Sequence, residues 1–207
     1  MERTKDEIRC EMNARRKQVS DERRRYTGKL IAERIDGGKI CLTRRAWCVS
    51  IYLSTRNEIP TRYIAHTVWA ADREICVPAW SMSEERYRLC KLYPMMKLIT
   101  GKHGIREPAE HDYVMSWTPD AFILPGLAFD PYGGRLGYGK GIYDGILSKA
   151  TSAAIKIGIC YDWQILDEPL PLEPHDRCVD WVVSDKRIIN CKQARALAAK
   201  PATPQEV

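Results

Sequence analysis

The fold is decided by residues 127–144, LAFDPYGGRLGYGKGIYD. Directly before them, the apolar run AFIL at residues 121–124 is long enough for a buried strand. After the glycines, residues 142–149 can form a short helix. Five of the chain's 13 glycines lie within residues 127–144. The predicted order is therefore a strand, a glycine-rich loop and a helix.

The glycine-rich loop is a candidate phosphate site. Glycines let the backbone approach a ligand closely, and loop amides beside a helix N-terminus attract anions. Arg135 and Lys140 add two positive charges. Residues 134–140 fit G-x-x-x-x-G-K, but the next residue is Gly141, so the Mg²⁺-binding hydroxyl of a P-loop is missing. We therefore expect a phosphate site of another kind, with a glycine-rich turn that binds no ligand as the alternative.

The segment AFDPYGGRLGYGKGIYD resembles the signature of the 5-formyltetrahydrofolate cyclo-ligases, also called methenyltetrahydrofolate synthetases. The family pattern is roughly A-F-D-x-x-G-x-R-L-G-x-G-x-G-Y-Y-D, and this chain departs from it at Ile142, where the family usually has tyrosine. The positions that match are Phe129, Asp130, Gly133, Arg135, Leu136, Gly137, Gly139, Gly141, Tyr143 and Asp144.

This resemblance implies an enzyme that cyclises 5-formyltetrahydrofolate to 5,10-methenyltetrahydrofolate with ATP and Mg²⁺. Arg135 and Lys140 would be catalytic, because they would neutralise charge on the transferring phosphate. Tyr138 and Ile142 would also contact the folate. The loop residues implied to bind the nucleotide are Gly134, Arg135, Leu136, Gly137, Tyr138, Gly139, Lys140, Gly141, Ile142 and Tyr143.

Two basic helices are predicted at the N-terminus. Residues 4–7, TKDE, form a capping box that starts a helix over residues 5–17, and a second helix follows from Ser20 to about residue 35. Lys5 and Arg9 share one face of the first helix. The segment K-x-x-I-R resembles the family's K-x-x-L-R pattern, in which both basic residues contact ATP. Most other basic residues here are expected to form a solvated face.

A loop after the first predicted strand is the candidate folate site. Residues 46–53, AWCVSIYL, are apolar on both faces, as in a central parallel strand. The family resemblance places the pterin-binding glutamate at Glu58 and pocket-lining residues at Tyr52 and Leu53. A carboxylate suits the amino and ring N–H donors of a pterin. Without the resemblance, Glu58 is more simply an acidic residue at a helix start before Pro60.

Three carboxylates are candidates for a metal. Asp144 follows the glycine loop, and the resemblance points to Asp176 as the acid before the last strand. Asp180 lies inside that strand pattern and is the competing candidate. His175 is more simply a solvated loop residue. Trp80 and Trp117 could each wall a flat ligand, although core or surface packing is the simpler expectation.

The remaining pattern indicates an α/β architecture. We expect one layered domain over residues 1–200, with a largely parallel central sheet flanked by helices, and a disordered tail at residues 201–207. Ligands should bind at the carboxyl ends of the strands. Residues 104–108, GIREP, are expected to form a loop, and they resemble the G-I-x-E-P segment of bacterial members of the cyclo-ligase family. The other expected strands and helices cover residues 60–71, 74–78, 87–92, 95–100, 154–161, 179–183 and 190–200.

Composition limits the function classes. The chain has 207 residues, 44% of them hydrophobic, and a net charge of +6. It has no run of 18 apolar residues and no apolar secretory segment near its start, so we expect no membrane span and a cytoplasmic location. The eight cysteines lack zinc-site spacing and are expected to be reduced thiols.

The cyclo-ligase chemistry requires no side-chain nucleophile, which agrees with the lack of a recognisable triad in the sequence. Alignment and charge neutralisation would be the protein's tasks. We expect a monomer that acts on small molecules rather than on nucleic acid. Two alternatives stay open: a family member that binds folate or nucleotide without catalysis, and a basic RNA-binding protein.

Overall fold

A central sheet organises the computed structural model, which describes residues 3–55, 57–114 and 119–199. Within these residues the sheet has seven strands; the five inner ones are parallel, and each edge strand is antiparallel to its neighbour. The spatial order is β11 (Ile188–Asn190), β10 (Trp181–Val183), β9 (Ile155–Ile159), β6 (Ala121–Leu124), β1 (Cys48–Ser50), β2 (Glu74–Ser81) and β3 (Arg86–Lys91).

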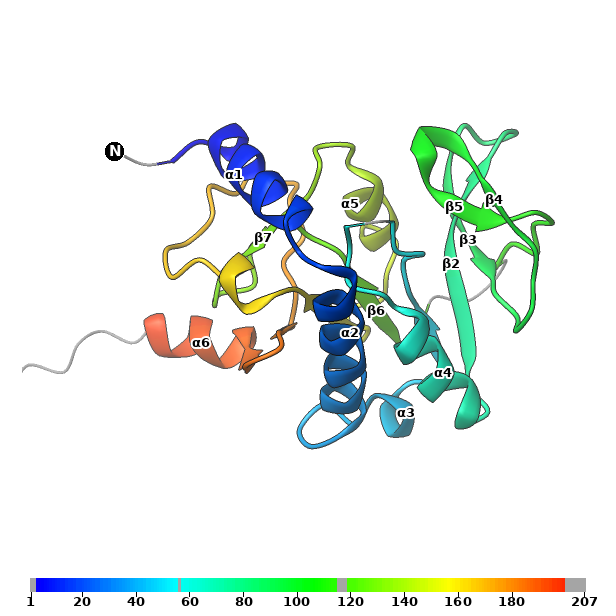
Figure 1. The fold of residues 1–207 in the computed structure, drawn as a ribbon, viewed down its shortest axis with the longest axis horizontal. Coiled ribbons are helices and arrows are strands. Elements are labelled where there is room, and N and C mark those ends of the chain that lie inside the picture. Colours follow the sequence, from blue (N-terminus) through cyan, green and yellow to red (C-terminus); the bar gives the residue numbers. More distant parts are fainter. Residues whose placement is uncertain (1–2, 56, 115–118, 200–207) are drawn as a thin grey trace, which may run out of the picture.

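Helices cover both faces of this sheet (Figure 1). On one face, α2 (Asp21–Asp36) and α4 (Arg62–Ala70) bury their apolar residues in one core. On the other face, α5 (Ile142–Leu147) and the start of α6 (Cys191–Ala198) belong to a second core. The predicted layered α/β fold with a largely parallel sheet is therefore confirmed.

Strand β6 shows why its sequence is apolar throughout. Ile123 belongs to the core under α2 and α4, whereas Phe122 and Leu124 belong to the core under α5 and α6. All four residues of the strand are buried. Successive side chains of a strand point to opposite faces, so a strand between two helical layers must be apolar at every position.

The two N-terminal helices begin where the sequence predicts. Helix α1 (Lys5–Lys17) starts with the Thr4–Glu7 capping box, in which each side chain accepts a hydrogen bond from the other residue's backbone N–H. The Ser20 hydroxyl caps α2 by accepting from the amide of Arg23. Local sequence therefore determines both starts, because each cap satisfies amides that the helix leaves unpaired.

Two small hairpins were not predicted. β4 (Leu98–Thr100) pairs with β5 (Arg106–Pro108), so the expectation of a loop over residues 104–108 was wrong for its last three residues. β7 (Ala128–Phe129) pairs with β8 (Arg135–Leu136), so the glycine-rich stretch contains a hairpin. Strands of two or three residues have too short a pattern to recognise, and their pairing partner decides them.

Several boundaries differ from the expected ones. The strand expected over residues 46–53 is confined to β1, and Trp47 before it is 57% exposed. The short helix α3 (Leu42–Arg45) and strand β11 were missed. Helix α5 ends at Leu147, not at residue 149. Trp117 and the tail at residues 201–207 lie outside the described residues, as does residue 200 of the last predicted helix.

The chain turns in opposite directions from two neighbouring strands. From β1 it passes through α4 to β2, and from β6 it passes through α5 to β9 on the other side. Those two helices lie on opposite faces of the sheet. The loops after β1 and β6 therefore diverge, which leaves a crevice at their carboxyl ends, where open α/β sheets bind ligands. In the described part of the chain, no helix combines the length and apolar character needed to cross a bilayer.

Two glycines provide a matched test of the packing. Phe129 is fully buried, and a Cβ added at Gly158 would lie 2.3 Å from its ring. Gly145 in α5 has no atom within 4 Å of an added Cβ. We expect Gly158→Ala to lower the free energy of unfolding by about 1–3 kcal/mol through overpacking. Gly145→Ala should leave it unchanged or raise it by up to about 1 kcal/mol, since alanine favours helix. Urea unfolding of both variants measures this, and equal effects would contradict the packing described.

Candidate functional site

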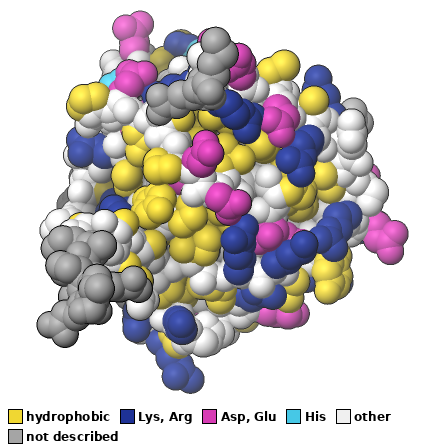
Figure 2. All heavy atoms as spheres, turned by 90° about the vertical axis from the view of Figure 1, so that its left-hand side faces the viewer, with side chains coloured by type: hydrophobic (Ala, Val, Ile, Leu, Met, Phe, Trp, Pro, Cys, Tyr) yellow, Lys and Arg dark blue, Asp and Glu magenta, His cyan; other side chains and the backbone are white. Residues whose placement is uncertain are grey.

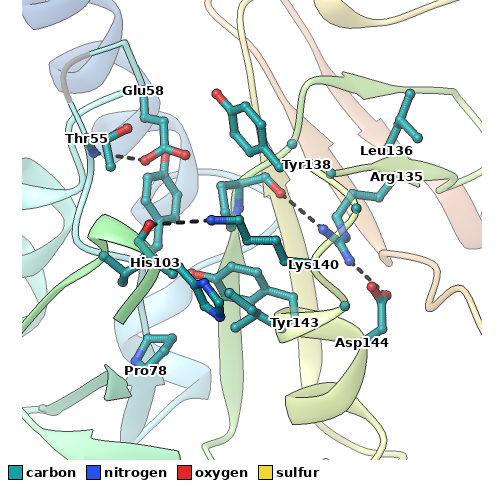
Figure 3. A pocket seen from close by; sticks show the side chains of 18 of the residues that line it. Thr55, Glu58, Pro78, His103, Arg135, Leu136, Tyr138, Lys140, Tyr143 and Asp144 are labelled. Carbon is teal, nitrogen blue, oxygen red and sulfur yellow. Dashed lines mark hydrogen bonds and ion pairs between the residues drawn. The ribbon is translucent and has the colours of Figure 1, made fainter. Parts of the chain in front are cut away.

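A pocket of about 400 Å³ lies at the carboxyl ends of β1 and β6. The segment after β1 contributes Tyr52, Leu53 and Glu58, and the segment after β6 contributes Pro125 and Gly126. Helix α1 and the glycine loop complete the lining. Figure 3 shows these segments converging on one space, with Lys140 near its centre. The predicted position of the ligand site in the fold therefore contains a pocket.

Four cationic side chains line one pocket: Lys5 and Arg9 from α1, and Arg135 and Lys140 from the glycine loop. Arg9 donates from Nε to the carbonyl of Gly137 at 3.1 Å, which ties α1 to the loop. The two pairs are more than a hundred residues apart in sequence. Their gathering supplies the positive charge that a polyphosphate requires.

Arg135 is the most buried of these cations, with 7% of its surface exposed. Its Nη2 donates to Asp144 at 2.8 Å, and its Nη1 donates weakly to the carbonyl of Pro125 at 3.5 Å. Among the described residues, its buried Nε has no hydrogen-bond partner. A buried donor without a partner costs free energy unless something binds it, so Arg135 has capacity for an anionic ligand.

The loop after β8 exposes its backbone. Gly139 and Gly141 have φ of 83° and 63°, a region that glycine enters without strain. The amides of residues 138–141 find no acceptor among the described residues. Lys140 reaches across the pocket and donates from Nζ to the carbonyl of His103 at 3.4 Å (Figure 3). This exposed backbone, together with Lys140, fits the predicted phosphate site.

A buried carboxylate shapes the base of the loop. Asp130 is 1% exposed and accepts hydrogen bonds from the amides of Tyr132, Gly134 and Leu170, each at 2.8 Å. A Cβ at Gly134 would lie 2.1 Å from the Asp130 carboxylate. Gly134 allows this close approach of Asp130 and is not among the residues that line the pocket, so its nucleotide-binding role stays a prediction.

Two of the three candidate metal carboxylates line the pocket. Asp144 accepts from Arg135, and Asp176 accepts from Lys5 at 2.8 Å. Asp180 lies elsewhere, between Lys156 and Lys192. In the described ranges, no group of three or more His, Cys, Asp or Glu residues is placed to hold a metal. Mg²⁺ commonly takes only one or two carboxylates and completes its shell with water and phosphate oxygens, so Asp144 and Asp176 suit it.

The Lys5–Asp176 pair brings α1 to the loop before β10. Burial raises the pKa of the Asp176 carboxyl, but hydrogen bonds from the amide of Glu173 and from Lys5 outweigh burial, so the pKa is lowered overall. Desolvation lowers the pKa of Lys5, and the two acidic partners Asp176 and Glu173 raise it by more. Both groups of the pair are therefore charged at neutral pH.

The opposite end of the pocket contains Glu58. Its Oε2 accepts from the amide of Thr55 at 2.9 Å. Tyr52 is buried, which raises the pKa of its phenol, and its hydroxyl donates to the carbonyl of Ile59 at 2.8 Å. Tyr52 therefore fixes the loop that presents Glu58. Leu53 and Ile142 contribute apolar surface, so this end combines a carboxylate acceptor with apolar walls.

Several lining residues were not predicted. Pro78 lies on β2, and His103 to Ile105 lie on the turn between β4 and β5. Thr55, Pro125 and Gly126 complete this group. The similarity of residues 104–108 to a family segment was the one sequence indication for Gly104 and Ile105. His103 could not be found in this way, because the contact that matters is its backbone carbonyl.

The eight cysteines are all unpaired thiols. Five of them, at positions 48, 76, 90, 160 and 191, are buried. Burial raises the pKa of the Cys160 thiol well above its ordinary value, which makes a reactive thiolate there unfavourable. None of the eight lines the pocket.

An α/β fold with a pocket at the divergence of two parallel strands defines a ligand-binding protein of the doubly wound type, here with a phosphate-like site and a carboxylate site in one cavity. Residues 1–185 match the model of the 5-formyltetrahydrofolate cyclo-ligase family, and the chain belongs to this family. The resemblance seen in the sequence is confirmed, as is the expected enzyme class, a ligase.

Similar proteins agree with this assignment. A probable 5-formyltetrahydrofolate cyclo-ligase of Schizosaccharomyces pombe is 30% identical over 187 residues, which cover 78% of this chain and 91% of that protein. The 5-formyltetrahydrofolate cyclo-ligase of Escherichia coli is 29% identical over 147 residues, covering 69% and 80%. The structure of Aquifex aeolicus 5,10-methenyltetrahydrofolate synthetase has a TM-score of 0.76 at 25% identity and covers 98% of this chain and 96% of its own. A synthetase from Mycoplasma pneumoniae, at 20% identity and a TM-score of 0.69 over 88% and 99%, supports the fold alone.

The role of Asp130 can be tested with an isosteric change. Asp130→Asn replaces an acceptor oxygen with a donor that would face backbone amides, so we expect the free energy of unfolding to fall by about 3 kcal/mol. Asp167→Asn is the matched control, because Asp167 is exposed and lacks these three amide donors. Its free energy of unfolding should stay within about 0.5 kcal/mol of that of the unmodified protein. Urea unfolding measures both, and a loss at Asp130 as small as that of the control would rule out the hydrogen-bonding role.

Proposed function

We propose that this protein converts 5-formyltetrahydrofolate to 5,10-methenyltetrahydrofolate with ATP and Mg²⁺, releasing ADP and phosphate. The observation that carries the proposal is that one pocket contains both the four cations around the glycine loop and, at the end away from Asp144, the carboxylate of Glu58. Such a cavity suits two ligands that react with each other, one rich in phosphate and one with ring N–H donors. Membership in the family and the names of its relatives support the same reaction.

The proposed reaction needs alignment more than side-chain chemistry. The formyl oxygen attacks the γ-phosphorus and displaces ADP, which gives a phosphorylated imidate. The folate N10 then attacks the formyl carbon and loses its proton, and phosphate leaves with the formyl oxygen. Both steps require the two substrates to be held in contact while negative charge on the phosphate is balanced.

The cations of the pocket would hold the triphosphate. Among the described residues, the buried Nε of Arg135 has no hydrogen-bond partner, and Lys140 can exchange its long contact with the His103 carbonyl for a phosphate oxygen. Lys5 and Arg9 would approach from α1. The remaining nucleotide contacts would come from the backbone of the loop, at residues 136–143, where the guanidinium of Arg9 lies beside Gly139. Fixed positive groups of this kind stabilise charge that develops in a transition state.

Asp144 and Asp176 would hold the Mg²⁺, which supplies charge neutralisation between the phosphate oxygens when it is bound. Each carboxylate has a cationic partner in the structure, so binding of the metal would share or replace these ion pairs. Until the metal binds, the ion pairs Arg135–Asp144 and Lys5–Asp176 keep both carboxylates at the pocket wall.

Glu58 would bind the pterin through its two carboxylate oxygens. Tyr52, Leu53, Tyr138 and Ile142 would form the surrounding walls. Ile142 keeps an apolar contact at the position where the family usually has tyrosine, but it offers no hydroxyl. We therefore propose the same substrate class with one polar contact fewer.

The two alternatives have less support. A binding protein without catalysis would not need Arg135, Lys140 and both carboxylates around one cavity. For RNA binding, the helices α1 and α2 should present free basic residues. Arg15 instead contacts Glu11 and Trp163, and Arg23 pairs with Asp185. On the face shown in Figure 2, Lys and Arg side chains lie among acidic and apolar ones.

We further propose a monomer that acts on small molecules in a reducing compartment such as the cytoplasm, where eight thiols would persist.

The first test is a spectroscopic assay of the purified protein. We expect absorbance of the methenyl folate to rise when 5-formyltetrahydrofolate, ATP and Mg²⁺ are all present, because each is needed to form or expel the phosphorylated group. Omission of any one should leave the trace flat. A flat trace in the complete mixture, from protein shown by circular dichroism to be folded, would reject the catalytic proposal and favour a binding role.

Lys140 tests the charge-stabilising role. We expect Lys140→Ala to lower kcat/KM at least tenfold, which corresponds to about 1.4 kcal/mol of transition-state stabilisation. Lys149→Ala is the matched control, since Lys149 is exposed in the turn after α5 and lies outside the pocket. Steady-state kinetics with both variants measures the difference. A Lys140→Ala rate within about threefold of the unmodified enzyme would remove this residue from the proposed role.

A further inference from the structure

Arg16, near the end of α1, is a buried cation that the reaction as described does not use. Its side chain is 3% exposed. Lys5, Arg9 and Met12 precede it at spacings of four, three and four residues, so all four share one face of the helix. Met12 and Arg16 are buried, so the C-terminal half of this face packs against the protein, while Lys5 and Arg9 line the pocket.

The guanidinium of Arg16 lies directly behind Glu58. Its Nε donates to the carbonyl of Asn57 at 2.9 Å, and its Nη2 is 3.9 Å from Oε1 of Glu58. Its Cζ lies 5.8 Å from the centre of the Tyr138 ring, within the range of a cation–π contact. In Figure 3, Glu58 and Tyr138 both lie on the side of Lys140 that faces away from Pro78. Arg16 thus contacts Glu58 from the segment after β1 and Tyr138 from the glycine loop.

The space behind Glu58 is small. A cavity of about 10 Å³ is bounded by Arg16, Tyr52, Glu58 and Tyr161, among others. On this measure it has room for about one water molecule. Glu58 is itself only 11% exposed, so its position is determined by its neighbours.

A guanidinium buried at this position lowers the stability of the fold unless an acceptor or an opposite charge compensates it. Within the described part of the chain, Nη2 of Arg16 is buried and makes no hydrogen bond. Nε alone would suffice to tie α1 to the loop at Asn57. The orphan Nη2 points to a charge interaction with Glu58, because a partly buried carboxylate needs a compensating charge.

We propose that Arg16 is a positioning residue for folate, which holds the Glu58 carboxylate toward the pterin and keeps Tyr138 of the glycine loop beside it. This inference rests on the proposed function, and on Glu58 as the pterin ligand. It predicts that Arg16 affects folate binding through Glu58, while nucleotide binding, which relies on Lys5, Arg9, Arg135 and Lys140, is left almost unchanged. A purely structural Arg16 would instead affect both ligands together.

The test is a double-mutant cycle measured by equilibrium binding. 5-Formyltetrahydrofolate is titrated without nucleotide, and Mg²⁺–ADP is titrated without folate, into the unmodified protein, Arg16→Met, Glu58→Gln and the double variant. We expect Arg16→Met to weaken folate binding about tenfold and nucleotide binding less than twofold. In the Glu58→Gln background, the change at Arg16 should cost less than twofold, because coupled residues are not additive.

Two further variants complete the test. Arg16→Lys keeps the charge but loses the planar fork, so an intermediate folate affinity is expected; it also serves as the test variant if Arg16→Met does not fold. Arg15→Met, the exposed neighbour, should leave folate binding unchanged.

Equal losses for both ligands, or additive effects of Arg16 and Glu58, would overturn the inference. If the unmodified protein binds Mg²⁺–ADP but no folate, the proposed function fails and the inference fails with it, whereas normal folate binding by Arg16→Met and Arg16→Lys overturns the inference alone.

Discussion

The buried carboxylate of Asp130 is the interaction on which the pocket depends. It accepts hydrogen bonds from backbone amides in two parts of the chain. Tyr132 and Gly134 donate from the hairpin, and Leu170 donates from the start of the loop that leads to Asp176. Three amide donors compensate the charge that burial would otherwise penalise. Because these bonds join the glycine hairpin to the later loop, they bring residues 135–144 and Asp176 to the same cavity.

The hairpin is also fixed from the other side by close packing. Phe129, the last residue of β7, lies against Gly126 and Gly158, where side chains would collide with its ring. The backbone of β9 and of the segment after β6 can therefore approach the ring closely. A rigid base of this kind matters for the proposed chemistry, since phosphoryl transfer depends on alignment within a fraction of an ångström.

Helix α1 connects the two ends of the pocket. Lys5 and Arg9 reach the glycine loop and the Asp176 loop, and Arg16 reaches the segment that holds Glu58. One helical face thus contacts three of the segments that line the cavity. The high density of arginine and lysine on this helix reflects contacts within the protein as much as solvation, which is why its basic character is a poor guide to nucleic-acid binding.

The sequence by itself determined the elements with strong local patterns: the capped helices α1 and α2, the apolar strand β6, and the glycine loop with its cations. Its long glycine motif also identified the family, because so many matched positions rarely coincide without common structure. What only the tertiary structure decided are contacts between distant segments. Gly134 lies against the buried Asp130 carboxylate, and Asp180 lies away from the pocket. Arg16 appeared in the sequence as one of several basic residues, and its burial behind Glu58 became visible only once α1 was placed against the loop after β1. Local propensity specifies where a helix begins, but the partner of a side chain depends on which segments the whole fold brings together.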